Sequence, residues 1–109
     1  MSVSDDFKVF VEEQLGRVLP VTTRRMFGGL GVYGRGLFFA LVHDNVLYFK
    51  GGAPNLADFE ARGCAPFRPY GDERTMQYYE VPGDVLEDLE LLEVWMTRAL
   101  TVAEEARGK

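Results

Sequence analysis

The sequence predicts an α+β domain in which helices lie beside an antiparallel sheet. Three observations predict it: apolar residues at helical spacing near the N-terminus, a central series of short strand-like segments separated by turn residues, and a long leucine-rich segment near the C-terminus. With 109 residues and 47% hydrophobic content, the chain is long enough for one core and too short for two comfortable domains. We therefore expect a single domain over residues 1–109.

The first predicted element is a helix over residues 5–15. Ser4 can act as its N-cap, two acidic residues follow in the first turn, and Gly16 stands just past the expected end. The apolar residues at helical spacing, which would face a core, are Phe7, Phe10, Val11 and Leu15.

A meander of three to four antiparallel strands is predicted next. The strand-like segments are residues 22–27, 29–33, 37–42 and 46–50. Gly34-Arg35-Gly36 and His43-Asp44-Asn45 separate the last three, and Gly, Asp and Asn tolerate the positive φ that tight hairpins require. These short connections predict hairpins between neighbouring strands.

The glycine-rich segment 24–36 contains Gly29-x-Gly31-x-x-Gly34, the spacing of a dinucleotide-binding fingerprint. That fingerprint must follow a strand and open a helix. Here residues 37–42 form an apolar and aromatic run of strand length instead. We therefore interpret the glycines as turn and close-packing positions in a sheet.

A short helix, two strands and a long helix complete the predicted order. The short helix covers residues 55–62 and is stopped by Gly63. Two prolines confine residues 66–70 to an edge or irregular strand, and residues 76–81 form the last strand before Pro82-Gly83.

The long C-terminal helix is predicted to begin at Asp84, which has capping-box spacing to Glu87. Its apolar residues cover more of the circumference than one sheet face needs, which indicates burial on two sides. The second side is either the domain's own core or a homodimer interface. Candidate dimer contacts are Leu91, Trp95 and Val102.

Catalytic and metal sites find little support in the sequence. His43 is the single histidine, and we interpret it as a turn residue beside Asp44. Cys64 is the single cysteine, so no internal disulfide is possible, and no cysteine–histidine cluster predicts zinc. We expect no catalytic residue, cofactor or metal. The chain has no signal peptide or long apolar span, which predicts a cytoplasmic location.

A nucleic-acid contact is an alternative prediction for the segment around Arg24, Arg25 and Arg35, with Tyr33 beside them. The net charge of −5 argues against binding by bulk attraction to phosphate. The abundant strand aromatics could stack single-stranded bases, but such platforms come with a basic groove. Pairing of the arginines with acidic residues such as Glu80 or those of the C-terminal helix is the favoured interpretation.

The spaced motifs of this chain resemble the N-terminal domain of the TfoX/Sxy family, proteins linked to the regulation of bacterial competence. The residues that carry the resemblance are Arg25-Met26-Phe27-Gly28-Gly29 with Gly31 and Tyr33, Phe39-Ala40, Leu47-Tyr48-Phe49-Lys50, Gly63, Pro66-Phe67 with Tyr70, Met76-x-Tyr78-Tyr79-x-Val81-Pro82, and the leucine-rich helix with Trp95 and Ala99. The resemblance implies a fold similar to secretion-chaperone-like folds. It supplies no catalytic residue, and we expect the separate C-terminal domain of the longer family members to be absent.

These observations together predict a non-enzymatic, cytoplasmic bacterial domain that acts through protein contacts in transcription-linked regulation. Its expected partners are a second copy of the chain and an unidentified protein. The two alternatives are the nucleic-acid-binding module described above and a small-molecule sensor or enzyme with a pocket between the sheet and the helices.

Overall fold

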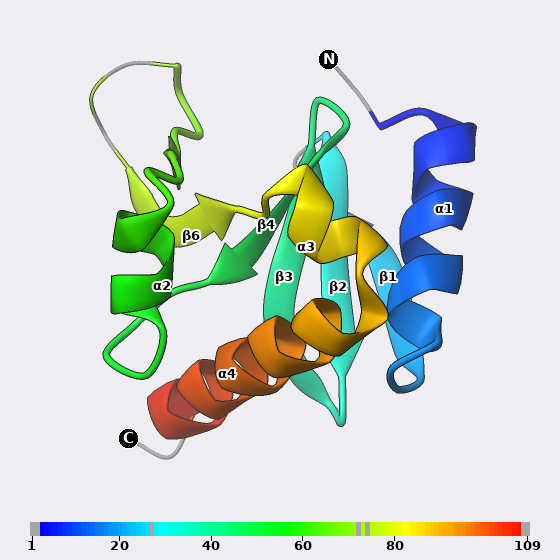
Figure 1. Cartoon of the computed structure of the whole chain (residues 1–109). Coiled ribbons are helices and arrows are strands. Elements are labelled where there is room, and N and C mark those ends of the chain that lie inside the picture. Colours follow the sequence, from blue (N-terminus) through cyan, green and yellow to red (C-terminus); the bar gives the residue numbers. More distant parts are fainter. Residues whose placement is uncertain (1–2, 27, 72, 74, 108–109) are drawn as a thin grey trace.

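The computed structural model, which describes residues 3–26, 28–71, 73 and 75–107, has a six-stranded antiparallel sheet with helices on one side (Figure 1). The strand order in the sheet is β1-β2-β3-β4-β6-β5. The elements are α1 (Asp5–Gly16), β1 (Val21–Met26), β2 (Gly29–Gly34), β3 (Leu37–His43), β4 (Val46–Lys50), α2 (Leu56–Ala61), β5 (Pro66–Phe67), β6 (Met76–Glu80), α3 (Gly83–Glu87) and α4 (Leu89–Arg107). The predicted α+β class and element order are confirmed.

Helix α1 begins as its sequence predicts. The Ser4 hydroxyl accepts a hydrogen bond from the Phe7 amide at 3.2 Å, which satisfies one of the free donors of the first turn. The end differs by one residue. Gly16 is the last helical residue, and Arg17 caps the helix in a right-handed conformation, so the expected left-handed glycine cap does not form.

The meander is held by two tight hairpins. Arg35 and Gly36 have φ values of 54° and 75°, and Asp44 and Asn45 have φ values of 52° and 61°. Positive φ at both central residues matches the right-handed twist of the strands that they join. The first strand of the meander ends at Met26 among the described residues, and Phe27, which the predicted strand includes, lies outside them.

A bulge in β3 lets two consecutive residues enter the core. Val32 is opposite Ala40 and Tyr33 is opposite Phe38, so Phe39 is an extra residue between them. Phe39 and Ala40 are both fully buried against the helices. The bulge therefore returns Phe38 to the opposite face of the sheet.

Strands β5 and β6 extend the same sheet beyond β4. Strand β6 pairs with β4 through Tyr48, Phe49 and Lys50, and the two-residue strand β5 forms the far edge, as its prolines predict. Helix α2 packs over this end. Phe59 stacks on Tyr79 with ring centroids 4.9 Å apart.

The predicted long C-terminal helix is confirmed as α4, but it begins at Leu89 and not at Asp84, because residues 83–87 form the separate short helix α3. Asp88 lies between α3 and α4 with an extended backbone (φ −108°, ψ 108°). Its carboxylate accepts hydrogen bonds from the amides of Glu90 at 3.0 Å and Leu91 at 3.3 Å, the geometry of an N-cap. The cap starts α4 in a new direction across the sheet (Figure 1).

Candidate functional site

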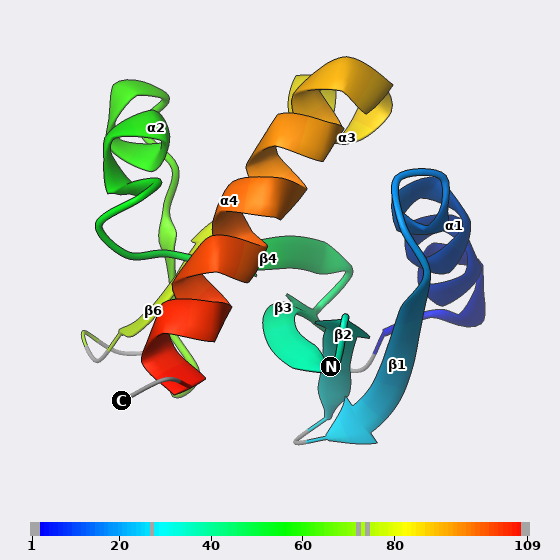
Figure 2. The ribbon, with the colours of Figure 1, turned by 90° about the horizontal axis from the view of Figure 1, so that it is seen from below.

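The sheet has an open face, defined here as the face turned away from the helices. Figure 2 shows the four helices of the described part on the other side of the sheet. Antiparallel sheets usually carry polar residues on a face that no element covers. Here the centre of the open face is aromatic and apolar. A second core cluster on it consists of Leu41, Phe67 and Tyr78, with Phe38 and Tyr48 packed against them.

The rings of this cluster pack closely enough to exclude water from its centre. Tyr33 stacks on Phe38 with centroids 5.2 Å apart, and Phe38 lies 5.7 Å from Tyr78. Tyr78 is only 4% exposed. Burial, with a smaller contribution from Tyr33, raises the pKa of the Tyr78 phenol to about 12. Burial also raises the pKa of Tyr48.

A groove of about 400 Å³ opens on this face. Its size lies in the range of small-molecule and side-chain pockets. Met26 lies flat across Gly31, where a Cβ atom would come within 2.6 Å of the Met26 Cε, so glycine at this position makes room for one wall. The residues that line the groove are Met26, Gly29, Leu30, Phe38, Leu41, Val42, His43, Phe67, Pro69, Tyr70, Thr75 and Met76.

His43 supplies the groove's imidazole. Its Nδ1 lies 3.6 Å from a carboxylate oxygen of Asp44, and its ring lies 5.2 Å from the ring of Phe67. The sequence predicts His43 in the turn, but it is the last residue of β3, and its side chain lies on the open face. In a largely apolar groove this arrangement can donate or accept one hydrogen bond while the walls hold an apolar group.

The small-molecule alternative expects a pocket between the sheet and the helices, whereas the groove lies on the opposite face. A second hollow, of about 390 Å³, does lie where the C-terminal end of α4 meets the sheet. It is lined by Tyr33, Gly36, Leu37, Phe38, Lys50, Tyr78, Ala103, Ala106 and Arg107.

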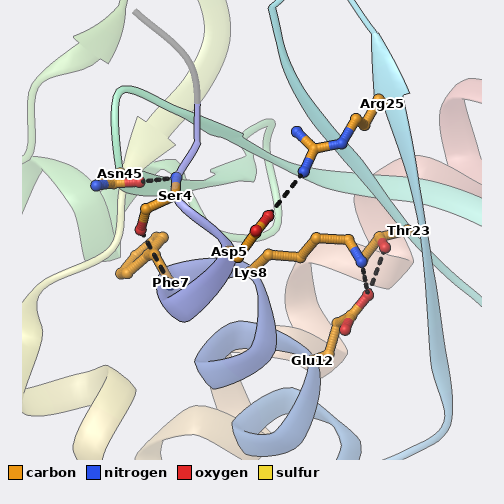
Figure 3. Close-up of polar contacts among 8 residues, drawn as sticks. All are labelled: Ser4, Asp5, Phe7, Lys8, Glu12, Thr23, Arg25 and Asn45. Atoms are coloured by element: carbon orange, nitrogen blue, oxygen red, sulfur yellow. Dashed lines mark hydrogen bonds and ion pairs between the residues drawn. The ribbon is translucent and has the colours of Figure 1, made fainter.

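The predicted basic patch is divided between two faces. Adjacent residues of a strand point to opposite sides, and Arg24 is opposite Gly31 on the open face, while Arg25 is opposite Leu30 on the helix face. Within the described residues Arg25 pairs with Asp5 of α1, at an N–O distance of 3.4 Å, and not with the expected Glu80 or the C-terminal helix (Figure 3). Tyr33 shares the face of Arg24, and Arg35 lies in the exposed β2–β3 turn.

Two of the three predicted dimer contacts belong to the domain's own interior. Trp95 is 8% exposed and packs edge-on against Phe59 at 5.2 Å. Val102 is 7% exposed and packs over Gly52, where a Cβ atom would lie 2.9 Å from it. Leu91 is 37% exposed. Burial thus removes Trp95 and Val102 from a free dimer surface, and the apolar width of α4 is explained in large part by its contacts with the sheet and α2.

Other chemistry in the described part of the chain is limited. Within those residues no group of three or more His, Cys, Asp or Glu side chains is placed to hold a metal ion. Cys64 is half-buried, and this burial raises the pKa of its thiol, which disfavours the reactive thiolate. Across the described ranges, every helix is too short or too polar to cross a bilayer.

The groove is absent from the sequence-based expectations, although the sequence contains one signal for it. Phe38, Leu41 and Tyr48 are large apolar or aromatic residues at strand positions that do not face the core. Period-two alternation assigns such residues to the second face of the sheet. Other groove residues come from a distant part of the chain, and their position does not follow from that periodicity: Phe67, Pro69, Tyr70, Thr75 and Met76.

Two comparisons connect the chain with known proteins. A model of the TfoX N-terminal domain matches residues 13–103. The DNA transformation protein TfoX1 of Aliivibrio fischeri (strain ATCC 700601 / ES114) is 33% identical over 96 residues, which make up 86% of this chain and 41% of that protein. The chain therefore spans about two fifths of the length of this curated relative.

Proposed function

We propose that this chain, which belongs to the TfoX N-terminal domain family, is a regulatory domain in bacterial DNA transformation that acts by contacting a protein partner. The link to transformation comes from the name of the relative, of which this chain covers 41%. A cytoplasmic location, the absence of catalysis and a role in transcription belong to the same proposal.

The proposed contact with a protein partner rests on one observation, the apolar groove on the open face of the sheet. Met76 at this groove is 43% exposed although its neighbours Leu41 and Phe67 are nearly buried. A contiguous apolar surface that no element covers is a common mark of an interaction site. Met side chains also adapt to partners of varied shape. The groove can therefore accept large apolar side chains of a partner protein.

The nucleic-acid alternative has weaker support. Arg24 and Arg25 point to opposite faces, so one nucleic-acid strand on the open face would meet only the first of them. Self-association also stays a prediction, now with Leu91 as the exposed residue of the three candidate dimer contacts.

The experiment deletes the gene for this chain in its bacterium, expresses wild type or a variant in the deletion strain, and measures the frequency of DNA transformation. Met76→Asp places a charge in the groove, while Val94→Asp makes a similar change on α4 at a side chain that is also 43% exposed. We expect deletion to change the frequency of DNA transformation and Val94→Asp to restore it as wild type does. Met76→Asp, at equal protein level, should not restore it.

Two results would count against the proposal in different ways. Unchanged transformation in the deletion strain removes the link to this process. Full restoration by Met76→Asp keeps that link and removes the groove as the contact site.

A further inference from the structure

The two edges of the sheet differ in how well they are protected against an added strand. The β5 edge is two residues long, begins with Pro66, and has an irregular register with β6. Short length, proline and irregularity are common devices that prevent pairing with another chain. The β5 edge is therefore a poor template for a further strand.

The β1 edge has few of these devices. It is six residues long, and its register with β2 is regular from Val21 to Met26 within the described residues. Its backbone hydrogen bonds in the described part of the chain go to β2, and α1 lies above β1 on the helix side, with no further strand beyond it (Figure 2). Ladder bonds use alternate residues on each side of a strand, so β1 presents unpaired N–H and C=O groups outward.

Two arginines give this edge a chemical preference. Arg24 and Arg25 are the charged residues of β1, and both are exposed. Arg24 has no ion pair among the described residues. Arg25 contacts Asp5, whose side chain is 94% exposed, and exposed pairs of this kind contribute little (Figure 3). The edge therefore carries one arginine on each face of the sheet, with Asp5 and Glu12 of α1 beside it on the helix face.

A second copy of the chain is a poor match for this edge. In antiparallel pairing of two β1 strands, residues on the same face must lie opposite each other. Registers centred on Thr23 or Arg24 give the most pairs, and they place the two Arg24 side chains diagonally or directly across from each other. Like charges at such positions are unfavourable. The arginines thus disfavour self-pairing and favour an acidic strand.

We propose that the β1 edge binds an extended acidic segment of a partner protein as a seventh strand. The main chain of the segment pairs with the outward N–H and C=O groups of β1. Two adjacent acidic residues of the segment point to opposite faces, where one meets Arg24 and the other meets Arg25. Met26 of β1 also lines the groove, but the proposal uses the main-chain edge of β1 and does not depend on the role of the groove.

The probe is a capped eight-residue peptide, Val-Thr-Val-Glu-Glu-Val-Thr-Val, titrated into the ¹⁵N-labelled chain and followed by amide shifts and hydrogen exchange. We expect amide shifts across residues 21–26 and slowed exchange at the alternate residues whose N–H groups point away from β2. Replacing Glu-Glu by Lys-Lys should weaken binding by at least about tenfold, because like charges then face the arginines. Separating the glutamates as Glu-Val-Glu should also weaken it, since both then lie on one face. Two further peptides carry N-methyl groups on their odd-numbered or on their even-numbered residues. Only one of these two sets donates hydrogen bonds to β1, so only one of the two peptides should lose binding.

The charge-reversed variant Arg24→Glu with Arg25→Glu should prefer the Lys-Lys peptide. Arg35→Glu, in the exposed turn outside β1, is the matched control and should bind as wild type does. The proposal is overturned by shifts that lie outside β1, by equal binding of both N-methylated peptides, or by no binding of the Glu-Glu peptide at millimolar concentration. If the two N-methylated peptides bind equally well, the peptide is attracted by charge alone and does not pair with the main chain of β1.

Discussion

Removal of one hydroxyl group tests whether the open face of the sheet excludes water. Tyr78 is 4% exposed in the aromatic cluster, and burial raises the pKa of its phenol to about 12 from an ordinary value of 10.0. Below pH 10 the phenol is neutral in the folded and the unfolded chain. Between pH 10 and 12 it ionises in the unfolded chain but stays protonated in the folded one, so the free energy of unfolding falls as pH rises.

The size of this effect follows from the pKa difference. Each pKa unit corresponds to about 1.4 kcal/mol, so a shift of roughly two units makes Tyr78 responsible for a loss of about 2–3 kcal/mol by pH 12. Tyr78→Phe removes the ionisable group and keeps the ring. The variant should therefore lose about 2–3 kcal/mol less than wild type across this pH range.

Urea unfolding at a series of pH values from 8 to 12, followed by circular dichroism, measures the difference. Tyr70→Phe, which removes a hydroxyl group from a side chain that is 67% exposed, is the matched control. The other tyrosines and the lysines are the same in the variant and in wild type. Their contributions therefore cancel when the change in unfolding free energy with pH is compared between the two proteins. If Tyr78→Phe and wild type lose stability in parallel, Tyr78 is solvated and the open face is not closed to water.

Two further substitutions test local structure by the shift in urea midpoint at neutral pH. Asp88→Ala removes the cap of α4 and should cost about 1 kcal/mol, while the adjacent Glu87→Ala should cost under about 0.5 kcal/mol; equal costs would refute the capping role. Asn55, 4% exposed, accepts from the Gly52 amide at 2.9 Å and donates to the Lys50 carbonyl at 3.0 Å. Asn55→Ala leaves both groups unpaired and should cost about 2–4 kcal/mol, whereas a loss under about 1 kcal/mol would show that water replaces the side chain.

The sheet meander and the start of α1 are local features, and the sequence predicts them well. The positive φ values of Arg35-Gly36 and Asp44-Asn45 arise within two-residue connections, and the capping hydroxyl of Ser4 is three residues from the amide whose hydrogen bond it accepts. Each requires only neighbouring residues. Local turn and cap chemistry is therefore enough to predict them.

The C-terminal region shows where local patterns are ambiguous. Asp84 and Asp88 are both acidic residues that can begin a helix, and the apolar periodicity continues through both. The structure uses Asp88 as the cap of α4, which allows Leu92 and Met96 to enter the core. The choice depends on packing against the sheet, which periodicity alone does not describe.

The arginine segment contains a sequence signal that the alternative of one nucleic-acid-binding patch overlooks. Arg24 and Arg25 are adjacent in a predicted strand, and strand alternation places adjacent residues on opposite faces. The alternation rule therefore suffices to separate the two side chains. That β1 is an exposed edge, by contrast, is a result of the whole sheet order.

The sequence by itself determined the α+β class, the order of the elements, the hairpin turns and the family resemblance, because these depend on residues close together in the chain. The tertiary structure alone decided that β6 pairs with β4, that Trp95 and Val102 are interior, and that Phe67 and Met76 help to close a groove against β1–β3. These features join segments far apart in the chain. Their free energy comes from burial and pairing between distant residues, and local propensity carries no record of it.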